Sequence, residues 1–163
     1  MQNQIGRLMA ALALAAGVTG LVGGCGTSGG GEGSSVRVSL EDLPDAPRAT
    51  IQRLTAGGRI ERIDREVENG RVVYDVEATV GGKHVEFLVA DSDGAVLGRE
   101  TSIDFSQLPA PVRAAAAAFF GHTDGLTAAR VEEFGRVSYE ITGARNGRNV
   151  EATFDPTGRL IET

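Results

Sequence analysis

The sequence of 163 residues contains no tryptophan, two tyrosines, two histidines and one cysteine. A lone cysteine cannot form an internal disulfide. The histidines, His84 and His122, lie far apart in the sequence, and neither has neighbours that would complete a zinc site or a nucleophile–base pair. The shortage of aromatic side chains also limits the hydrophobic anchoring of a ligand. We therefore expect no enzymatic activity and no cofactor.

Positive charge is scarce as well. Lysine and arginine together number 16, against 22 aspartate and glutamate residues, which gives a formal net charge of −6. Nucleic-acid binding needs a basic surface, and electrostatic docking on anionic lipid needs a basic patch. The composition therefore argues against a nucleic-acid partner and against attachment to a membrane by charge alone.

The N-terminal part has the pattern of an export signal. Arg7 is the only charged residue in 1–24, and it precedes an apolar run over 8–22. A membrane-spanning helix needs about 20 apolar residues. The run is shorter and is interrupted by Gly17 and Gly20, so it is typical of a cleaved secretory signal.

The end of this run, Val22-Gly23-Gly24-Cys25, resembles the lipobox of bacterial lipoproteins. The resemblance implies a lipoprotein signal peptide over 1–24 and acylation of Cys25, palmitate included, which would anchor the protein to a membrane on the periplasmic side of a bacterial cell envelope. Gly26 after the cysteine favours the outer membrane where an envelope has two. Residues 25–36 are rich in glycine and serine and cannot bury apolar surface, so we expect a flexible tether.

An internal repeat covers the remaining chain. When the sequence is shifted by 65 residues, Leu43-Pro44 falls on Leu108-Pro109 and Tyr74 falls on Tyr139. Further identities follow without a gap, and a repeat of this kind indicates duplicated structural units. The sequence predicts two copies, one over 37–101 and the other over 102–163.

Each copy begins with a helix and continues with strands. The segments "RVVYDVEATV" (71–80) and "KHVEFLVA" (83–90) alternate between apolar and polar residues, as half-buried strands do, and Gly81-Gly82 between them predicts a tight hairpin. The strand before them differs in phase between the copies, which indicates a bulge or a shifted boundary. The predicted fold class is α+β: two tandem repeats, each one helix followed by an antiparallel sheet of three to four strands, with the helices on one face of the sheet. The sequence leaves open whether the two sets of strands join.

The order of motifs resembles the PepSY-like domains of bacterial envelope proteins and, more distantly, the tandem folds of the β-lactamase-inhibitor-protein type. The motifs that carry the resemblance in the first copy are Leu43-Pro44, Gly70, Tyr74-Asp75-Val76, Gly82-Lys83 and Asp91 to Gly94, and those in the second are Leu108-Pro109, Gly135, Tyr139-Glu140-Ile141, Gly147-Arg148 and Asp155 to Gly158. The resemblance implies a non-catalytic envelope protein that binds or inhibits another envelope protein, such as a peptidase. The alternative is a cation-responsive or purely structural envelope component without a partner on its sheet.

The polar side of the predicted strands is the candidate partner-binding face, because the opposite side would be covered by helices. An acidic face of this kind suits a protein that carries basic groups. The residues expected to face water there are Val73, Asp75, Glu77, Thr79, His84, Glu86, Leu88, Ser138, Glu140, Thr142, Asn149, Glu151 and Thr153.

Asp91 and Asp93 are candidates for a cation site, because Asp91-Ser92-Asp93-Gly94 is similar to the beginning of an EF-hand loop. No glutamate completes such a loop at the required spacing. The corresponding stretch Asp155-Pro156-Thr157-Gly158 keeps the turn residues and loses the second carboxylate. We therefore predict a turn here and no metal.

Overall fold

The computed structural model describes residues 35–68 and 70–163. The elements are β1 (Val36–Arg37), η1 (Leu40–Asp42), α1 (Asp45–Leu54), β2 (Arg59–Glu68), β3 (Arg71–Val80), β4 (Lys83–Ala90), β5 (Val96–Ile103), η2 (Phe105–Gln107), α2 (Ala110–Phe120), β6 (Thr127–Glu133), β7 (Arg136–Arg145), β8 (Arg148–Phe154) and β9 (Leu160–Glu162). The predicted signal peptide, Cys25 and nearly all of the tether lie outside the described residues. Among the residues described, no helix is both long enough and apolar enough to cross a membrane.

Local sequence signals explain where these elements begin and end. Pro109 directly precedes α2 and Pro111 lies in its first turn, whereas Gly121 ends the helix with φ of 79°, a left-handed conformation that suits glycine. The pairs Gly81-Gly82 and Asn146-Gly147 all have positive φ, as tight two-residue hairpin turns require. The hairpin predicted at Gly81-Gly82 and the strands predicted over 71–80 and 83–90 are confirmed.

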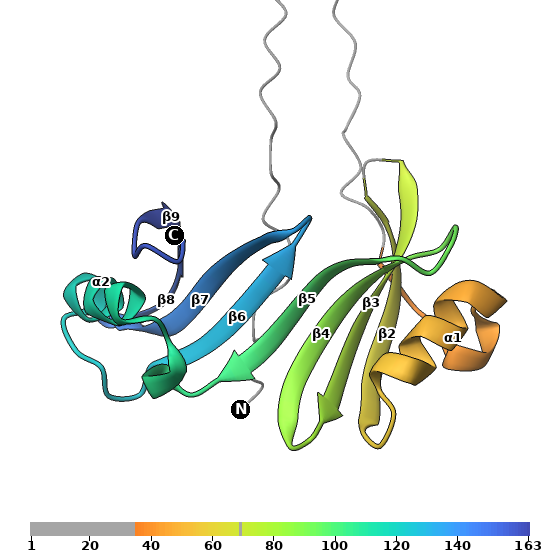
Figure 1. Ribbon diagram of the computed structural model, residues 1–163, viewed down its shortest axis with the longest axis horizontal. Helices are drawn as coiled ribbons and strands as arrows, with labels where there is room; N and C mark the ends of the chain where they lie inside the picture. The colour runs from red at the N-terminus through yellow and green to blue at the C-terminus, as the bar shows by residue number, and fades with distance from the viewer. Residues whose placement is uncertain (1–34, 69) are drawn as a thin grey trace, which may run out of the picture.

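The strands form one antiparallel sheet in which each strand pairs with its neighbour in sequence, from β1 to β9 (Figure 1). The predicted fold class is therefore wrong: the chain does not build two helix-plus-sheet units, but a single nine-stranded, mostly β structure with two α-helices in its described part. The pairing of β5 with β6, from Gly98 opposite Glu133 to Ile103 opposite Ala128, runs across the predicted boundary at 101/102. A strand end left unpaired there would expose backbone N–H and C=O groups, and the β5–β6 pairing satisfies them.

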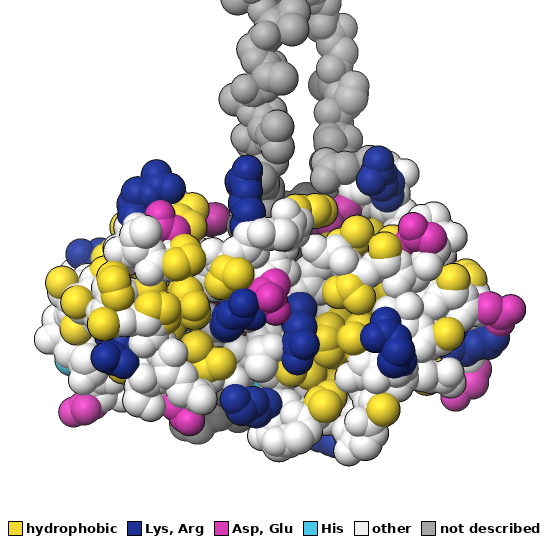
Figure 2. All heavy atoms as spheres, viewed as in Figure 1, with side chains coloured by type: hydrophobic (Ala, Val, Ile, Leu, Met, Phe, Trp, Pro, Cys, Tyr) yellow, Lys and Arg dark blue, Asp and Glu magenta, His cyan; other side chains and the backbone are white. Residues whose placement is uncertain are grey.

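The helices pack on one face of this sheet over two apolar clusters. Around α1 the cluster includes Ile51, Val76 and Phe87, and around α2 it includes Val112, Ala116, Phe120, Ile141 and Phe154. The strand registers place both sets of strand residues on the same face, which we call the helix face. The strand residues between the clusters on this face include Arg99 and Arg130, and Figure 2 shows basic side chains gathered between the helices.

The strand β2 contains the irregularity that the sequence indicated. Its register with β3 shifts between Ile60 and Arg62, as expected for a β-bulge. The bulge changes which side chains face the helices, so that Ile63 and Tyr74 both reach the cluster around α1. Of the two alternatives that the sequence left open, a bulge or a shifted boundary, the structure shows the bulge.

A candidate binding face with buried carboxyl groups

The thirteen residues of the predicted binding face lie on one side of the sheet, opposite the helix face. In β3 and β4 the register places Asp75 beside Leu88, and Glu77 beside Glu86. In β7 and β8 it places Glu140 beside Thr153. The strands β5 and β6 join the two groups, so they share one continuous surface, which we call the open face because both described α-helices pack on the other side.

The centre of the open face is less accessible than the sequence predicted. Val73, Glu86 and Leu88 were expected to face water, but their exposed fractions are 2%, 2% and 5%. Asn149 is exposed, and the other nine predicted residues are partly buried. The prediction that all thirteen residues are exposed to solvent is therefore wrong. Strand alternation indicates which side of the sheet a residue occupies, but not how deeply its neighbours bury it.

Glu100 on β5 is the most enclosed acid of the open face, and it is not among the thirteen residues predicted for the binding face. It lies directly opposite Glu86 of β4, which itself lies opposite Glu77 of β3. Three carboxyl groups thus stand side by side on adjacent strands. Glu100 is 1% exposed, and neither of its carboxyl oxygens has a hydrogen-bond partner among the described residues. The signal that could have revealed it is the alternation of Gly98, Glu100 and Ser102 along β5.

Burial and like charge raise the pKa of several of these carboxyl groups. Burial, together with the charges of Glu151, Asp75 and Glu133, raises the pKa of Glu100 to about 7. Burial also raises the pKa of Glu140, helped by the nearby Glu100 and Glu151. Asp75 behaves in the same way, because burial raises its pKa more than its hydrogen bond with Glu86 lowers it. The open face therefore holds protons that ordinary surface carboxylates would have lost at neutral pH.

The considered cation site at Asp91 and Asp93 is a turn in the structure. Asp91 accepts a hydrogen bond of 2.5 Å from the Tyr74 hydroxyl, and Asp93 accepts one of 3.0 Å from the backbone N–H of Ala95. Both aspartates thus serve local structure. In the described part of the chain, no group of three or more His, Cys, Asp or Glu residues is placed to hold a metal ion.

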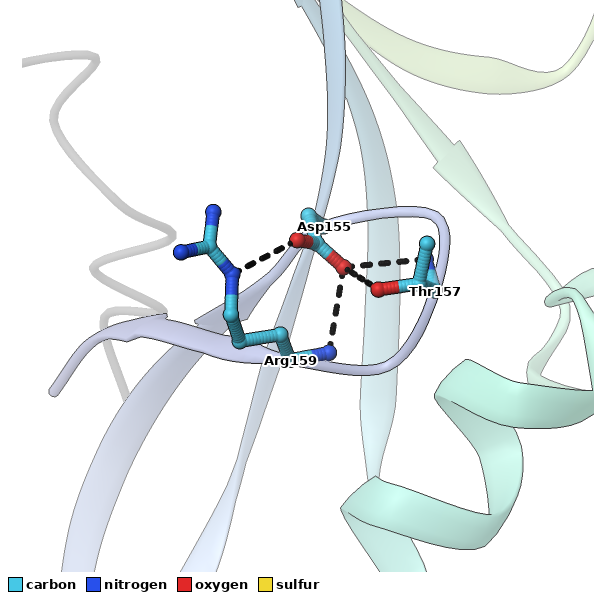
Figure 3. A network of polar contacts seen from close by, with 3 residues as sticks. All are labelled: Asp155, Thr157 and Arg159. Atoms are coloured by element: carbon cyan, nitrogen blue, oxygen red, sulfur yellow. Dashed lines mark hydrogen bonds and ion pairs between the residues drawn. The ribbon is translucent and has the colours of Figure 1, made fainter.

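The equivalent turn after β8 shows the same role more clearly (Figure 3). Asp155 accepts hydrogen bonds from the backbone N–H and hydroxyl of Thr157 and from the backbone N–H of Arg159, and its other oxygen pairs with the Arg159 guanidinium at 2.9 Å. These bonds from Thr157 and Arg159 lower the pKa of Asp155 well below its usual range. The carboxylate closes the loop between β8 and β9.

The turn glycines bring these loops against the helices. A Cβ atom at Gly94 would lie 2.6 Å from the carbonyl oxygen of Ala46 in α1, and one at Gly158 would lie 2.6 Å from that of Pro111 in α2. Both positions also have positive φ. Each Asp-x-x-Gly segment therefore packs its backbone directly on the first turn of a helix, which accounts for the motif without a cation.

The histidines and tyrosines also have structural surroundings. His122 follows α2, and its ring nitrogens lie 3.1 Å from the carbonyl oxygen of Asp124 and 2.8 Å from that of Ala144. His84 lies on β4, opposite Thr79. Burial raises the pKa of Tyr74 to about 12, with its hydrogen bond to Asp91 adding to the effect. The structure does not bring the two histidines together.

Comparison with known proteins gives a likeness at the level of the fold. No family model matches the chain, and no curated protein matches it. Among solved structures, a Bacteroides eggerthii protein described provisionally as periplasmic is similar with a TM-score of 0.57 and 18% sequence identity, covering 74% of this chain and 86% of its own. A DUF2874 family protein from Bacteroides ovatus is similar with a TM-score of 0.56 and 13% identity, covering 74% and 85%. At these identities, the similarity establishes a shared fold and leaves function to be argued from the residues.

Proposed function

We propose that the chain is a non-catalytic protein of the bacterial cell envelope that binds another protein through its open face. The observation that supports this most directly is the continuity of that face. Its acids extend from Glu66 on β2 to Glu162 on β9, and they outnumber its arginines, which by register are Arg37, Arg59, Arg62, Arg71 and Arg136. A surface with one predominant sign of charge favours partners of the opposite sign and speeds their association.

The envelope location has support from two sources. The sequence over 1–25 has the pattern of a lipoprotein export signal, and one solved protein of similar fold is described provisionally as periplasmic. The lipid on Cys25 is the anchor that we propose.

Crosslinking from the open face tests the partner. We expect a photoreactive amino acid at Asn149, an exposed position on β8, to capture one defined envelope protein in living cells. The same group at Ala118, exposed on α2, should not capture it. Reversing charge with Glu77→Arg should reduce the yield at least about tenfold, because a basic partner would then meet a like charge, whereas Glu41→Arg on η1 should leave it unchanged. Equal capture from both faces would contradict the proposed function.

Metabolic labelling tests the anchor separately. We expect labelled palmitate to be incorporated into the wild-type chain, and incorporation to be lost in Cys25→Ser, which also moves the protein from the membrane fraction to the soluble fraction. Equal labelling of the two proteins would contradict the lipid anchor but leave the binding face untouched.

A further inference from the structure

A pocket of about 290 Å³ opens at the end of the open face, where β5, β6 and β7 lie side by side. Its polar lining comes from Glu100 and Ser102 of β5 and from Glu140 and Thr142 of β7. Its apolar lining comes from Ile103, Phe105, Leu126 and Ala128. The size suits a small molecule or a single side chain, since pockets for drug-sized ligands begin at about 300 Å³.

Glu100 distinguishes this pocket from a chance gathering of acids. Its side chain is almost completely enclosed, yet both of its carboxyl oxygens lack a hydrogen-bond partner among the described residues. Leaving a buried polar group unpaired costs about 1–3 kcal/mol, and more for a charged group. A native structure retains such a group at a cost, and a ligand that donates hydrogen bonds to both oxygens would remove that cost.

The chemistry of the lining selects the ligand. Carboxyl and hydroxyl oxygens at one end accept several hydrogen bonds, while the apolar side chains beside them suit a chain of methylene groups. A guanidinium or ammonium group on an alkyl stem has both features. A metal ion fits less well, because it would need more ligands than the described residues supply here. We propose that this pocket binds an alkyl guanidinium or ammonium group between Glu100 and Glu140.

The charged groups that act on Glu100 are all acidic, which favours a cationic ligand. Glu86 on β4 lies opposite it, and Glu133 on β6, Glu151 on β8 and Asp75 on β3 add negative potential. Burial and these neighbouring acids favour the protonated forms of Glu100 and Glu140. A bound cation would instead pair with the ionised carboxylates, so binding must release protons. Affinity is therefore expected to increase as the pH rises towards 7, by up to about tenfold per pH unit for each proton released.

The inference does not depend on the proposed protein partner, because the cation can be a free small molecule or a side chain of a protein. We suggest titrating the purified full chain with n-propylguanidinium and following backbone amide shifts by NMR, with the uncharged n-propylurea as control. The expected result is saturable shifts at pocket positions such as Thr127 and Thr142, and none with the urea. No saturable shift with the guanidinium at pH 6 or at pH 8 would overturn the proposal.

Variants test the residues. Glu100→Gln should weaken binding at least about tenfold, because it removes one charge-assisted hydrogen-bond acceptor. Glu41→Gln changes an exposed acid on η1, away from the open face, and should bind as the wild type does. Ala129→Leu fills the pocket without changing charge, and it should also abolish binding, which keeps the test valid if Glu100→Gln folds poorly. Unchanged binding in Ala129→Leu would overturn the site.

A comparison of peptides with n-propylguanidinium distinguishes a protein side chain from a free small cation as the ligand. A blocked Ala-Arg-Ala peptide that binds at least about tenfold more tightly than n-propylguanidinium would indicate a protein side chain, and the citrulline peptide should then fail to bind. Equal affinity would indicate a free small cation. Both outcomes support the pocket, and the second would stand even if crosslinking from the open face captures no protein.

Discussion

Replacing Glu100 by glutamine is expected to make the folded protein less sensitive to alkaline pH. The unfolded chain holds this carboxyl near its ordinary value of 4.5, whereas the folded protein raises its pKa to about 7. Between these values the folded state binds more protons than the unfolded state, so the free energy of unfolding falls as pH rises. The wild-type protein should lose roughly 2–3 kcal/mol from this group between pH 5 and pH 8.

In Glu100→Gln, the contribution of residue 100 to the fall in unfolding free energy disappears, because an amide does not titrate. Urea denaturation of both proteins at pH 5, 6, 7 and 8 measures the effect, and the difference between the two unfolding free energies should change steadily from pH 5 to pH 7 and then level off. Glu41→Gln, an exposed acid on η1, should follow the wild type. Parallel curves for wild type and Glu100→Gln would contradict a buried, protonated Glu100.

Placing a methyl group at Gly94 is expected to destabilise the protein by about 2–5 kcal/mol. Part of the cost, about 1–2 kcal/mol, comes from the positive φ at position 94, which is unfavourable for alanine because it has a Cβ atom. The remainder comes from overpacking, typically about 1–3 kcal/mol, because the new Cβ would lie 2.6 Å from the Ala46 carbonyl oxygen. The turn would have to move away from α1.

A second glycine separates the two contributions. Gly82 has a similar φ of 76°, but nothing lies within 4 Å of the position that its Cβ would take. Thermal or urea unfolding should therefore show a larger loss for Gly94→Ala than for Gly82→Ala, by about 1–3 kcal/mol. Equal losses would mean that the turn does not pack on the helix as the structure describes.

Local features of this fold are readable in the sequence. The alternation of Val72, Tyr74 and Val76 with Val73 and Asp75 is enough to locate β3 and to assign each residue to a face, because successive side chains of a strand point to opposite sides. The phase change in β2 correctly indicates a bulge. Asp155 and Gly158, without a second carboxylate, correctly indicate a turn.

The pairing of the strands is harder to predict from the sequence, for a physical reason. Whether β5 pairs with β6 depends on residues that lie far apart in the sequence, such as Gly98 and Glu133. The apolar–polar periodicity of a strand does not indicate which other strand it pairs with. The burial of a side chain on one face of the sheet is equally hard to predict from the sequence. Glu100 and Glu77 look alike as outward acids of a strand, but only Glu100 lies near the middle of the sheet among the acids of five other strands.

The order of the sheet has a consequence for how the chain acquires its shape. Since every strand from β1 to β9 pairs with the strand next to it in sequence, long loops need not close before pairing begins. Low contact order of this kind accompanies rapid folding, in contrast to β-sandwiches whose strands pair across the whole chain. The sheet can extend hairpin by hairpin from whichever end forms first, so little unpaired edge needs to persist while the molecule assembles.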